Sequence, residues 1–304
     1  MNKENLERKN TEFDELYNQV YSETHKELEE SLIPFKEKIK KILIVFLTID
    51  IFMLFINPAM IIMSLILILI ILLMMYRKNT KEYRHLYKTK VLQRFIQLYN
   101  KNLKFYPDKG IPYDQYKEAE FEKCDNYLYG DLITGKIDEY NIKMAQIITE
   151  LIRYGSKGEK QYTSVFQGFF AISTFENNFD GIIKVRTDQG KFLNTIYNKN
   201  KLEMDSQTFE NYFDVISTNN IQTLQVLTPD VMNMLLKFEQ EHNIKVELTI
   251  KKNKIYIRFH CKKFFSPPVL SLMDYNTLLK DYNIINFTFD ITRELIKTTA
   301  KTKI

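Results

Sequence analysis

Apolar residues concentrate in residues 42–76, a hydrophobic stretch interrupted by Asn57-Pro58. A soluble helix needs a polar face, and 59–76 offers only two polar side chains. As one helix the stretch would be about 52 Å long, against a hydrocarbon core of about 30 Å. Pro58 lacks an N–H and disfavours helical angles at Asn57, so a break there is reasonable. The pattern predicts a two-helix transmembrane hairpin with its break at Asn57-Pro58, and a re-entrant hairpin is the alternative.

Helical periodicity continues on both sides of this stretch. It predicts an N-terminal cytosolic helix within 1–41 and a basic juxtamembrane helix within 77–104. Folding at Asn57-Pro58 would pair the two helices antiparallel as a short stalk. Acidic side chains of the first helix would then face basic side chains of the second, namely Glu23, Glu27, Glu29 and Glu30 against Lys88, Lys90 and Arg94. Apolar contact of Leu28 and Leu32 with Tyr87 should carry most of the stability, because exposed ion pairs contribute little.

From residue 105 onward the pattern changes to alternating strands and short helices. Strand-like runs cover 126–133, 136–139, 141–154, 161–175, 181–187, 213–217, 244–250 and 254–261. Helical patterns cover 112–123, 206–212, 229–241, 268–280 and 290–300. Polar turns between neighbouring runs predict two hairpins, 141–154 with 161–175 and 244–250 with 254–261. The expected fold class is α+β, with the transmembrane hairpin followed by a cytosolic domain, 105–304, built on a mainly antiparallel sheet.

The net charge of +5 is unevenly distributed along the chain. Residues 77–104 carry nine basic groups against Glu82 alone, while 105–304 is neutral. The basic residues flanking the apolar stretch are Lys38, Lys40 and Lys41 before it and Arg77, Lys78 and Lys81 after it. Positive charge on both sides predicts a multi-pass cell-membrane protein with both termini cytoplasmic. The expected partner is the lipid bilayer, and no nucleic-acid partner is expected, because the basic excess lies only beside the apolar stretch.

Two polar residues lie inside the apolar stretch. Asp50 falls near mid-depth of the first arm, where an ionised carboxylate costs several kcal/mol. Folding at Asn57-Pro58 brings Ser64 roughly level with it, so a hydrogen bond from Ser64 is expected. That bond is too weak to offset a buried charge, so Asp50 should be largely protonated or shared between subunits of a homo-oligomer. One tolerated polar residue in a wet or thinned region is the alternative.

No motif predicts a catalytic, cofactor or metal site. Gly130 to Lys136 fits G-x-x-x-x-G-K, but Ile137 follows where a phosphate loop needs Ser or Thr, and the pattern downstream is extended. The four histidines are far apart, and His260 and Cys261 would point to opposite faces of a strand. Cys124 has no neighbouring base, and both cysteines are expected to be reduced thiols.

Two further clusters have a structural explanation. The phenylalanines between 166 and 179 are expected to be hydrophobic core with a strand bend at Gly168, and a ligand-binding floor is the alternative. The basic run from Lys251 to Lys254 is expected to be a solvated hairpin tip, and contact with anionic headgroups is the alternative.

Several stretches together resemble a known family. In order they are FYPDKGIPYDQY, CDNYLYGDLITGKIDEYNIKMAQI, VFQGFFAISTF, FENYFDV, VLTPDVMNMLLKF and KIYIRFH. They resemble the bacterial membrane-protein family catalogued as domain of unknown function 3137, over about 105–265 and the preceding spans. The resemblance implies membrane attachment and a cytosolic module, without an activity or a catalytic residue to carry over.

The function expected from the sequence is a membrane-anchored, non-enzymatic cytosolic module that binds a protein or a small ligand at the inner membrane face. One alternative is an oligomeric membrane effector or transporter assembled around Asp50. The other is an enzyme acting on a membrane-proximal substrate, since a site assembled in space is invisible in the sequence.

Overall fold

The computed structural model describes residues 3–56, 59–187, 201–262, 264–266 and 273–301. Within these, only the backbone is described for 3–10, 54–56, 59–60, 76–82 and 177. The chain forms two compact units. The first is Met1–Tyr99 with Ser266–Asn276, and the second is Asn100–Phe265 with Thr277–Ile304.

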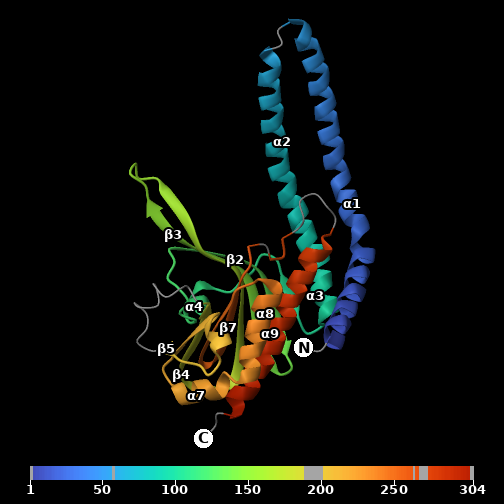
Figure 1. The fold of residues 1–304 in the computed structure, drawn as a ribbon. Coiled ribbons are helices and arrows are strands. Elements are labelled where there is room, and N and C mark those ends of the chain that lie inside the picture. Colours follow the sequence, from blue (N-terminus) through green and yellow to red (C-terminus); the bar gives the residue numbers. More distant parts are fainter. Residues whose placement is uncertain (1–2, 57–58, 188–200, 263, 267–272, 302–304) are drawn as a thin grey trace. The chain divides into compact units, whose positions relative to one another are not determined.

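Two long helices form the first unit. Helix α1 (Lys3–Ile56) and helix α2 (Ala59–Leu86) run antiparallel, as Figure 1 shows. A short π-helical turn, η1 (Tyr87–Leu92), and helix α3 (Gln93–Tyr99) continue α2. The predicted break at Asn57-Pro58 lies outside the described residues.

The predicted stalk is confirmed. Lys90 lies 3.0 Å from Glu27, and Arg94 Nη2 donates to Glu23 Oε1 at 3.0 Å. Leu28, Leu32 and Tyr87 are buried. The charge complementarity expected from the sequence is therefore present, and the residues expected to make the apolar contact are buried.

The prediction of a transmembrane hairpin is wrong. Within the part of the chain that the structure describes, no helix combines the length and the apolar character needed to cross a membrane. The apolar stretch is divided between α1, which takes 42–56, and α2, which takes 59–76. At 1.5 Å per residue these segments are about 22 Å and 27 Å long, shorter than the hydrocarbon core of about 30 Å. The prediction of a multi-pass cell-membrane protein with both termini cytoplasmic depended on this hairpin and is wrong for the same reason.

The second unit is α+β, with an antiparallel sheet of seven described strands in the order β1-β2-β3-β4-β6-β5 and with β7 paired to β4. The strands are β1 (Lys104–Tyr106), β2 (Asn126–Ile137), β3 (Tyr140–Tyr154), β4 (Lys160–Thr187), β5 (Lys201–Leu202), β6 (Phe213–Ser217) and β7 (Val246–His260). The β3–β4 hairpin is as predicted. The predicted runs 126–133 and 136–139 form one strand, β2, with an irregularity between Gly130 and Ile133.

Strand β7 folds back on itself, as its sequence pattern predicts. His260 N donates to Lys245 O at 2.9 Å, although fifteen extended residues would separate the two ends by roughly 50 Å. Lys252, at the fold, has φ +54°. Strand β4 bends around this tip, because 168–174 pair with 260–254 and 182–185 pair with 251–248. Gly181, with φ +118°, lies at the bend.

The helices of this unit are α4 (Tyr113–Lys117), α6 (Gln207–Glu210), α7 (Asn220–Val226), α8 (Pro229–His242) and α9 (Tyr275–Lys301). Helix α8 begins as predicted, with Thr228 accepting from Val231 N. The helices predicted at 268–280 and 290–300 are instead one helix, α9, whose described part starts at Tyr275. Phe238 of α8 and Phe287 of α9 pack on Phe259 of β7, so both helices cover one face of the sheet.

Candidate functional sites

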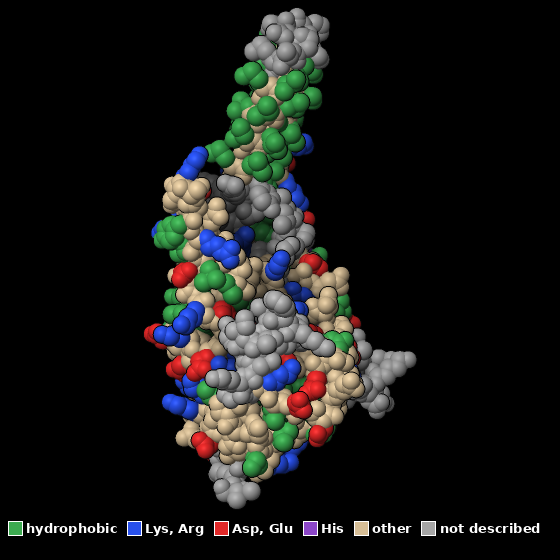
Figure 2. Space-filling view, turned by 60° about the vertical axis from the view of Figure 1, so that its left-hand side comes forward, with side chains coloured by type: hydrophobic (Ala, Val, Ile, Leu, Met, Phe, Trp, Pro, Cys, Tyr) green, Lys and Arg blue, Asp and Glu red, His purple; other side chains and the backbone are tan. Residues whose placement is uncertain are grey.

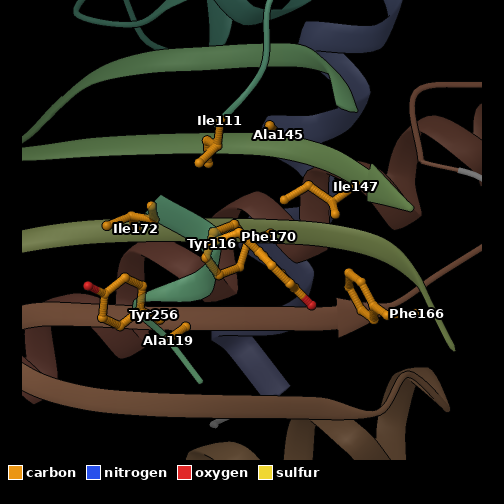
Figure 3. Packing of buried hydrophobic residues seen from close by; sticks show 9 residues of the cluster. All are labelled: Ile111, Tyr116, Ala119, Ala145, Ile147, Phe166, Phe170, Ile172 and Tyr256. Carbon is orange, nitrogen blue, oxygen red and sulfur yellow. The ribbon is translucent and has the colours of Figure 1, made fainter. Parts of the chain in front are cut away.

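The opposite face of the sheet is covered by a segment that we call the strap, residues 111–125. It contains α4 and continues as a turn and a segment without regular secondary structure, where a longer helix over 112–123 was predicted. Ile111, Tyr116 and Ala119 of the strap are buried against Phe170 and Tyr256 of the sheet, as Figure 3 shows. The apolar contact fixes the strap on this face.

Three alternating glutamates of the strap meet basic and hydroxyl groups of the sheet. Glu118 accepts from Lys254 at 2.5 Å and from Tyr256 OH at 2.7 Å. Glu120 accepts from Lys184 at 2.9 Å and also from Lys251. Lys251 and Lys254 therefore do not form the solvated hairpin tip expected from the sequence.

The third glutamate, Glu122, belongs to a buried charge cluster around Arg258. Arg258 Nη1 donates to Glu122, and Arg258 Nε donates to Glu247. Arg258 is 7% exposed and Glu247 2%. Tyr116 OH donates to Glu122 at 2.5 Å, and Thr149 Oγ1 donates to Glu122 at 2.9 Å. The carboxylates thus have several donors each, which a buried ion pair requires.

Aromatic rings enclose the guanidinium groups of this cluster. The Cζ atom of Arg258 lies 4.2 Å from the ring centroid of Phe121 and 4.7 Å from that of Phe166. Arg186 Cζ lies 4.2 Å from the same Phe121 ring. Delocalised, weakly hydrated guanidinium groups suit such stacking, which an ammonium would not reproduce.

The protonation states follow from these contacts. Burial raises the pKa of Glu247, but the hydrogen bond from His260 and the charges of Arg258 and Arg186 outweigh it and lower the pKa to about 2. Burial likewise lowers the pKa of Arg258, but Glu247, Tyr116 and Glu122 outweigh it and raise the pKa. Glu247 and Arg258 are therefore ionised at neutral pH, and a carboxylate neutralised in this way is a poor general base.

Arg186 is the incompletely bonded member of the cluster. Its Nη2 donates to the carbonyl of Glu120 at 3.2 Å, while its Nη1 is buried without a hydrogen-bond partner among the described residues. Burial lowers the pKa of Arg186 to about 10. An unsatisfied buried donor is costly and marks a position where a ligand or water can bind.

A second candidate is the apolar surface of the α1–α2 hairpin. Sixteen large hydrophobic side chains between Leu43 and Met74 are exposed among the described residues, with Phe52 67% and Met63 71% exposed. The others are Leu43, Ile44, Val45, Leu47, Ile49, Ile51, Ile62, Leu65, Ile66, Leu67, Leu69, Ile70, Leu73 and Met74. Figure 2 shows hydrophobic side chains gathered over this part of the hairpin.

The predicted polar pair lies inside this hairpin. Asp50 is half-buried and Ser64 is buried, on the sides of α1 and α2 that are shielded from solvent. Asp50 Oδ1 and Ser64 Oγ have no hydrogen-bond partner among the described residues. The expected bond between Ser64 and Asp50 is thus absent, although both residues are inward-facing.

The structure describes only part of the predicted basic flank. Lys38, Lys40 and Lys41 are exposed on α1, directly before the apolar surface. Arg77, Lys78 and Lys81 belong to α2, but their side chains lie outside the described residues.

The remaining sequence motifs have structural roles. Gly130 to Lys136 lies within β2, with no helix after it. Burial raises the pKa of the Cys124 thiol and raises that of Cys261 to about 12, so neither is an activated nucleophile. His260 contacts Glu247 at 3.1 Å, and no group of three or more metal-ligating side chains occurs in the described part of the chain. The phenylalanines at 166, 169, 170, 175 and 179 are buried core, as expected, but β4 bends at Gly181 and not at the predicted Gly168.

The Arg258 cluster was missed by sequence reasoning. Its members lie on β3, β4, β7 and the strap, far apart in the chain. The alternation of Glu118, Glu120 and Glu122 is visible in the sequence, but it does not mark a strand, because Glu118 caps helix α4 and Glu120 has φ +53°.

Comparison with known proteins bears out the family resemblance. Residues 164–297 match the family described as protein of unknown function (DUF3137), a little under half of the chain. The matched segment includes Arg186, Glu247 and Arg258 but neither the strap nor the hairpin, so it does not support the membrane attachment that the resemblance implies. No curated protein matches the chain significantly.

Among solved structures, the chain is similar to the crystal structure of the mycobacterial trehalose monomycolate transport factor A, TtfA. The two are 10% identical, and the similarity covers 67% of this chain and 94% of that chain with a TM-score of 0.34. Similarity at this level establishes neither a shared fold nor a shared role.

Proposed function

We propose that this protein is a non-enzymatic binding module whose α1–α2 hairpin takes a lipid bilayer as its partner. The observation that carries the proposal is the exposed apolar surface between Leu43 and Met74. It comprises sixteen exposed large hydrophobic side chains on two adjacent helices, whereas soluble monomers rarely expose contiguous apolar patches larger than a few hundred Å². Water is an unfavourable environment for such a surface, so a partner should cover it.

The distribution of polar groups favours lipid over a second copy of the chain. The outward positions are apolar on several sides of both helices, while Asp50 and Ser64 face inward. A partner helix covers one stripe of its neighbour, whereas acyl chains cover every side at once. Apolar side chains can be buried in the outer part of a bilayer without a helix that crosses the bilayer.

The basic side chains beside the apolar surface support the same partner. Lys38, Lys40 and Lys41 are exposed at its boundary, where their charges would meet phosphate headgroups. Each basic residue near an anionic leaflet contributes about 1 kcal/mol. The apolar side chains should bind neutral and anionic lipid equally well. The basic side chains should add to this affinity, which should therefore rise with the fraction of anionic lipid in the vesicles.

The chemistry of the Arg258 cluster favours binding over catalysis. Glu122 and Glu247 each have charged or hydroxyl donors, and both thiols have raised pKa values. These groups stabilise charge but are not poised to abstract a proton or attack a substrate.

Flotation of the full chain with vesicles tests the proposal. The wild type should float with phosphatidylcholine vesicles, and more strongly with phosphatidylglycerol added. The double variant Ile66→Glu and Ile70→Glu should stay at the bottom, because both side chains are exposed on the apolar surface. The matched control is Ile221→Glu with Leu224→Glu on α7, two exposed apolar positions of the second unit, which should float like the wild type.

Two results would overturn lipid as the partner. One is a wild type that remains unbound while its mass in solution is that of a defined oligomer. The other is equal flotation of the wild type and the hairpin variant.

A further inference from the structure

The charges between the strap and the sheet do not balance. Five cations lie there, Lys184, Arg186, Lys251, Lys254 and Arg258, with four carboxylates, Glu118, Glu120, Glu122 and Glu247. Four of the cations contact a carboxylate. Arg186 donates no hydrogen bond to a carboxylate among the described residues; it donates to the backbone carbonyl of Glu120 and stacks on Phe121, while the layer as a whole has one more cation than carboxylates.

A second unsatisfied group lies beside Arg186 on the same face. Thr249 is fully buried, and its hydroxyl has no hydrogen-bond partner among the described residues. Thr249 is the register partner of Lys184, which contacts the strap, so Thr249 also faces the strap. Arg186 lies two residues beyond Lys184 on β4, which places it on this face and makes it a diagonal neighbour of Thr249, about 7–8 Å away between Cα atoms.

We infer that Arg186 and Thr249 bind a small oxyanion, a carboxylate or phosphate group, between the strap and the sheet. The guanidinium Nη1 and the threonine hydroxyl are both donors, and a shared oxyanion would satisfy both. Its negative charge would also neutralise the excess cation. A metal ion does not fit, because the unsatisfied nitrogen cannot be a ligand, and an apolar group would leave both donors unpaired.

The neighbouring carboxylates do not repel such a ligand strongly. Arg258 and Arg186 offset the charge of Glu247, Lys184 and Lys251 offset that of Glu120, and Lys201 offsets that of Asp214, the register partner of Arg186 on β6. Lys184 and Lys251 are partly buried at this edge of the strap, and their positive charges favour an anion over a cation there. The site belongs to the second unit and does not depend on lipid binding by the hairpin.

Thermal unfolding of the full chain tests the inference. Inorganic phosphate and acetate are compared with chloride at equal ionic strength, because a ligand that binds only the folded state raises the Tm. We expect phosphate, acetate or both to raise the wild-type Tm above its value in chloride, and the stronger of the two identifies the ligand chemistry. Arg186→Met should abolish the rise, and Thr249→Val should weaken the apparent affinity at least about fivefold.

The exposed arginine Arg153 supplies the matched control. Arg153→Met removes the same charge from the surface of β3 and should keep the full response. If Arg186→Met fails to fold, the Tm response of Thr249→Val still tests the inference, because this variant loses one hydroxyl group and no charge. The inference is overturned if neither anion raises the wild-type Tm, or if Thr249→Val and Arg186→Met respond as the wild type does.

Discussion

Glu247 and Arg258 face each other across the two arms of the folded strand β7, and Arg258 Nε donates to Glu247 Oε2. The same oxygen lies 3.1 Å from His260 Nε2, and Arg258 Nη1 donates to Glu122 of the strap. This pair therefore links the two arms of β7 to the segment that covers them.

Arg258→Met should strongly destabilise the protein. The substitution leaves Glu247 and Glu122 buried without their cation, and breaking one side of a buried pair costs about 3–5 kcal/mol. Urea unfolding should show this loss as a lower midpoint with an unchanged slope.

The control for this prediction is Arg293→Met, which breaks the exposed pair of Arg293 with Asp138. We expect a loss of less than about 1 kcal/mol there. Equal losses in the two variants would mean that the buried cluster has no special role in stability.

Asp281 should make stability fall as the pH rises from about 4 to about 8. The residue is fully buried on α9, its Oδ2 accepts from Phe265 N at 3.0 Å, and burial raises its pKa to about 8. The folded state thus keeps a proton that the unfolded state releases above about pH 4, so unfolding is favoured as the pH rises through this range. Asp131 acts in the same direction and Lys280 in the opposite one.

Asp281→Asn should remove this dependence, because an amide keeps the acceptor for Phe265 N without a titrating proton. Urea unfolding at about pH 5 and about pH 8 measures it. Asp290→Asn, an exposed position on the same helix, should keep the wild-type slope. A wild-type stability that is flat or rising between these pH values would contradict the prediction.

The sequence predicts those helices and strands that pair with a segment close to them in the chain. The β7 hairpin follows from two apolar runs around Lys252, and the stalk follows from a fold-back that brings Glu27 opposite Lys90. The strap depends on tertiary contacts of Glu118 and Tyr116, which no local pattern contains. The transmembrane prediction was wrong because the apolar part of each arm is shorter than a hydrocarbon core, whereas the prediction accepted arms of this length as spans.

The stalk should depend on its buried leucine far more than on its ion pairs. Leu28→Ala removes a fully buried side chain and should cost about 2–5 kcal/mol. Glu27→Gln removes an exposed pair and should cost less than about 1 kcal/mol. Hydrogen exchange of the amides in α3 measures both, with faster exchange expected in Leu28→Ala. Equal protection in the two variants would show that packing at Leu28 does not hold the stalk.

Lipid contact by the hairpin is tested most directly by single-tryptophan fluorescence, because the chain contains no tryptophan. Phe52→Trp places the probe on the apolar surface, and Tyr154→Trp places it at an exposed position of β3. With vesicles containing brominated phosphatidylcholine, the emission of Phe52→Trp should shift to the blue and be quenched, while that of Tyr154→Trp should not change. An unchanged spectrum for Phe52→Trp, or equal quenching at both positions, would contradict the proposal that the hairpin binds lipid.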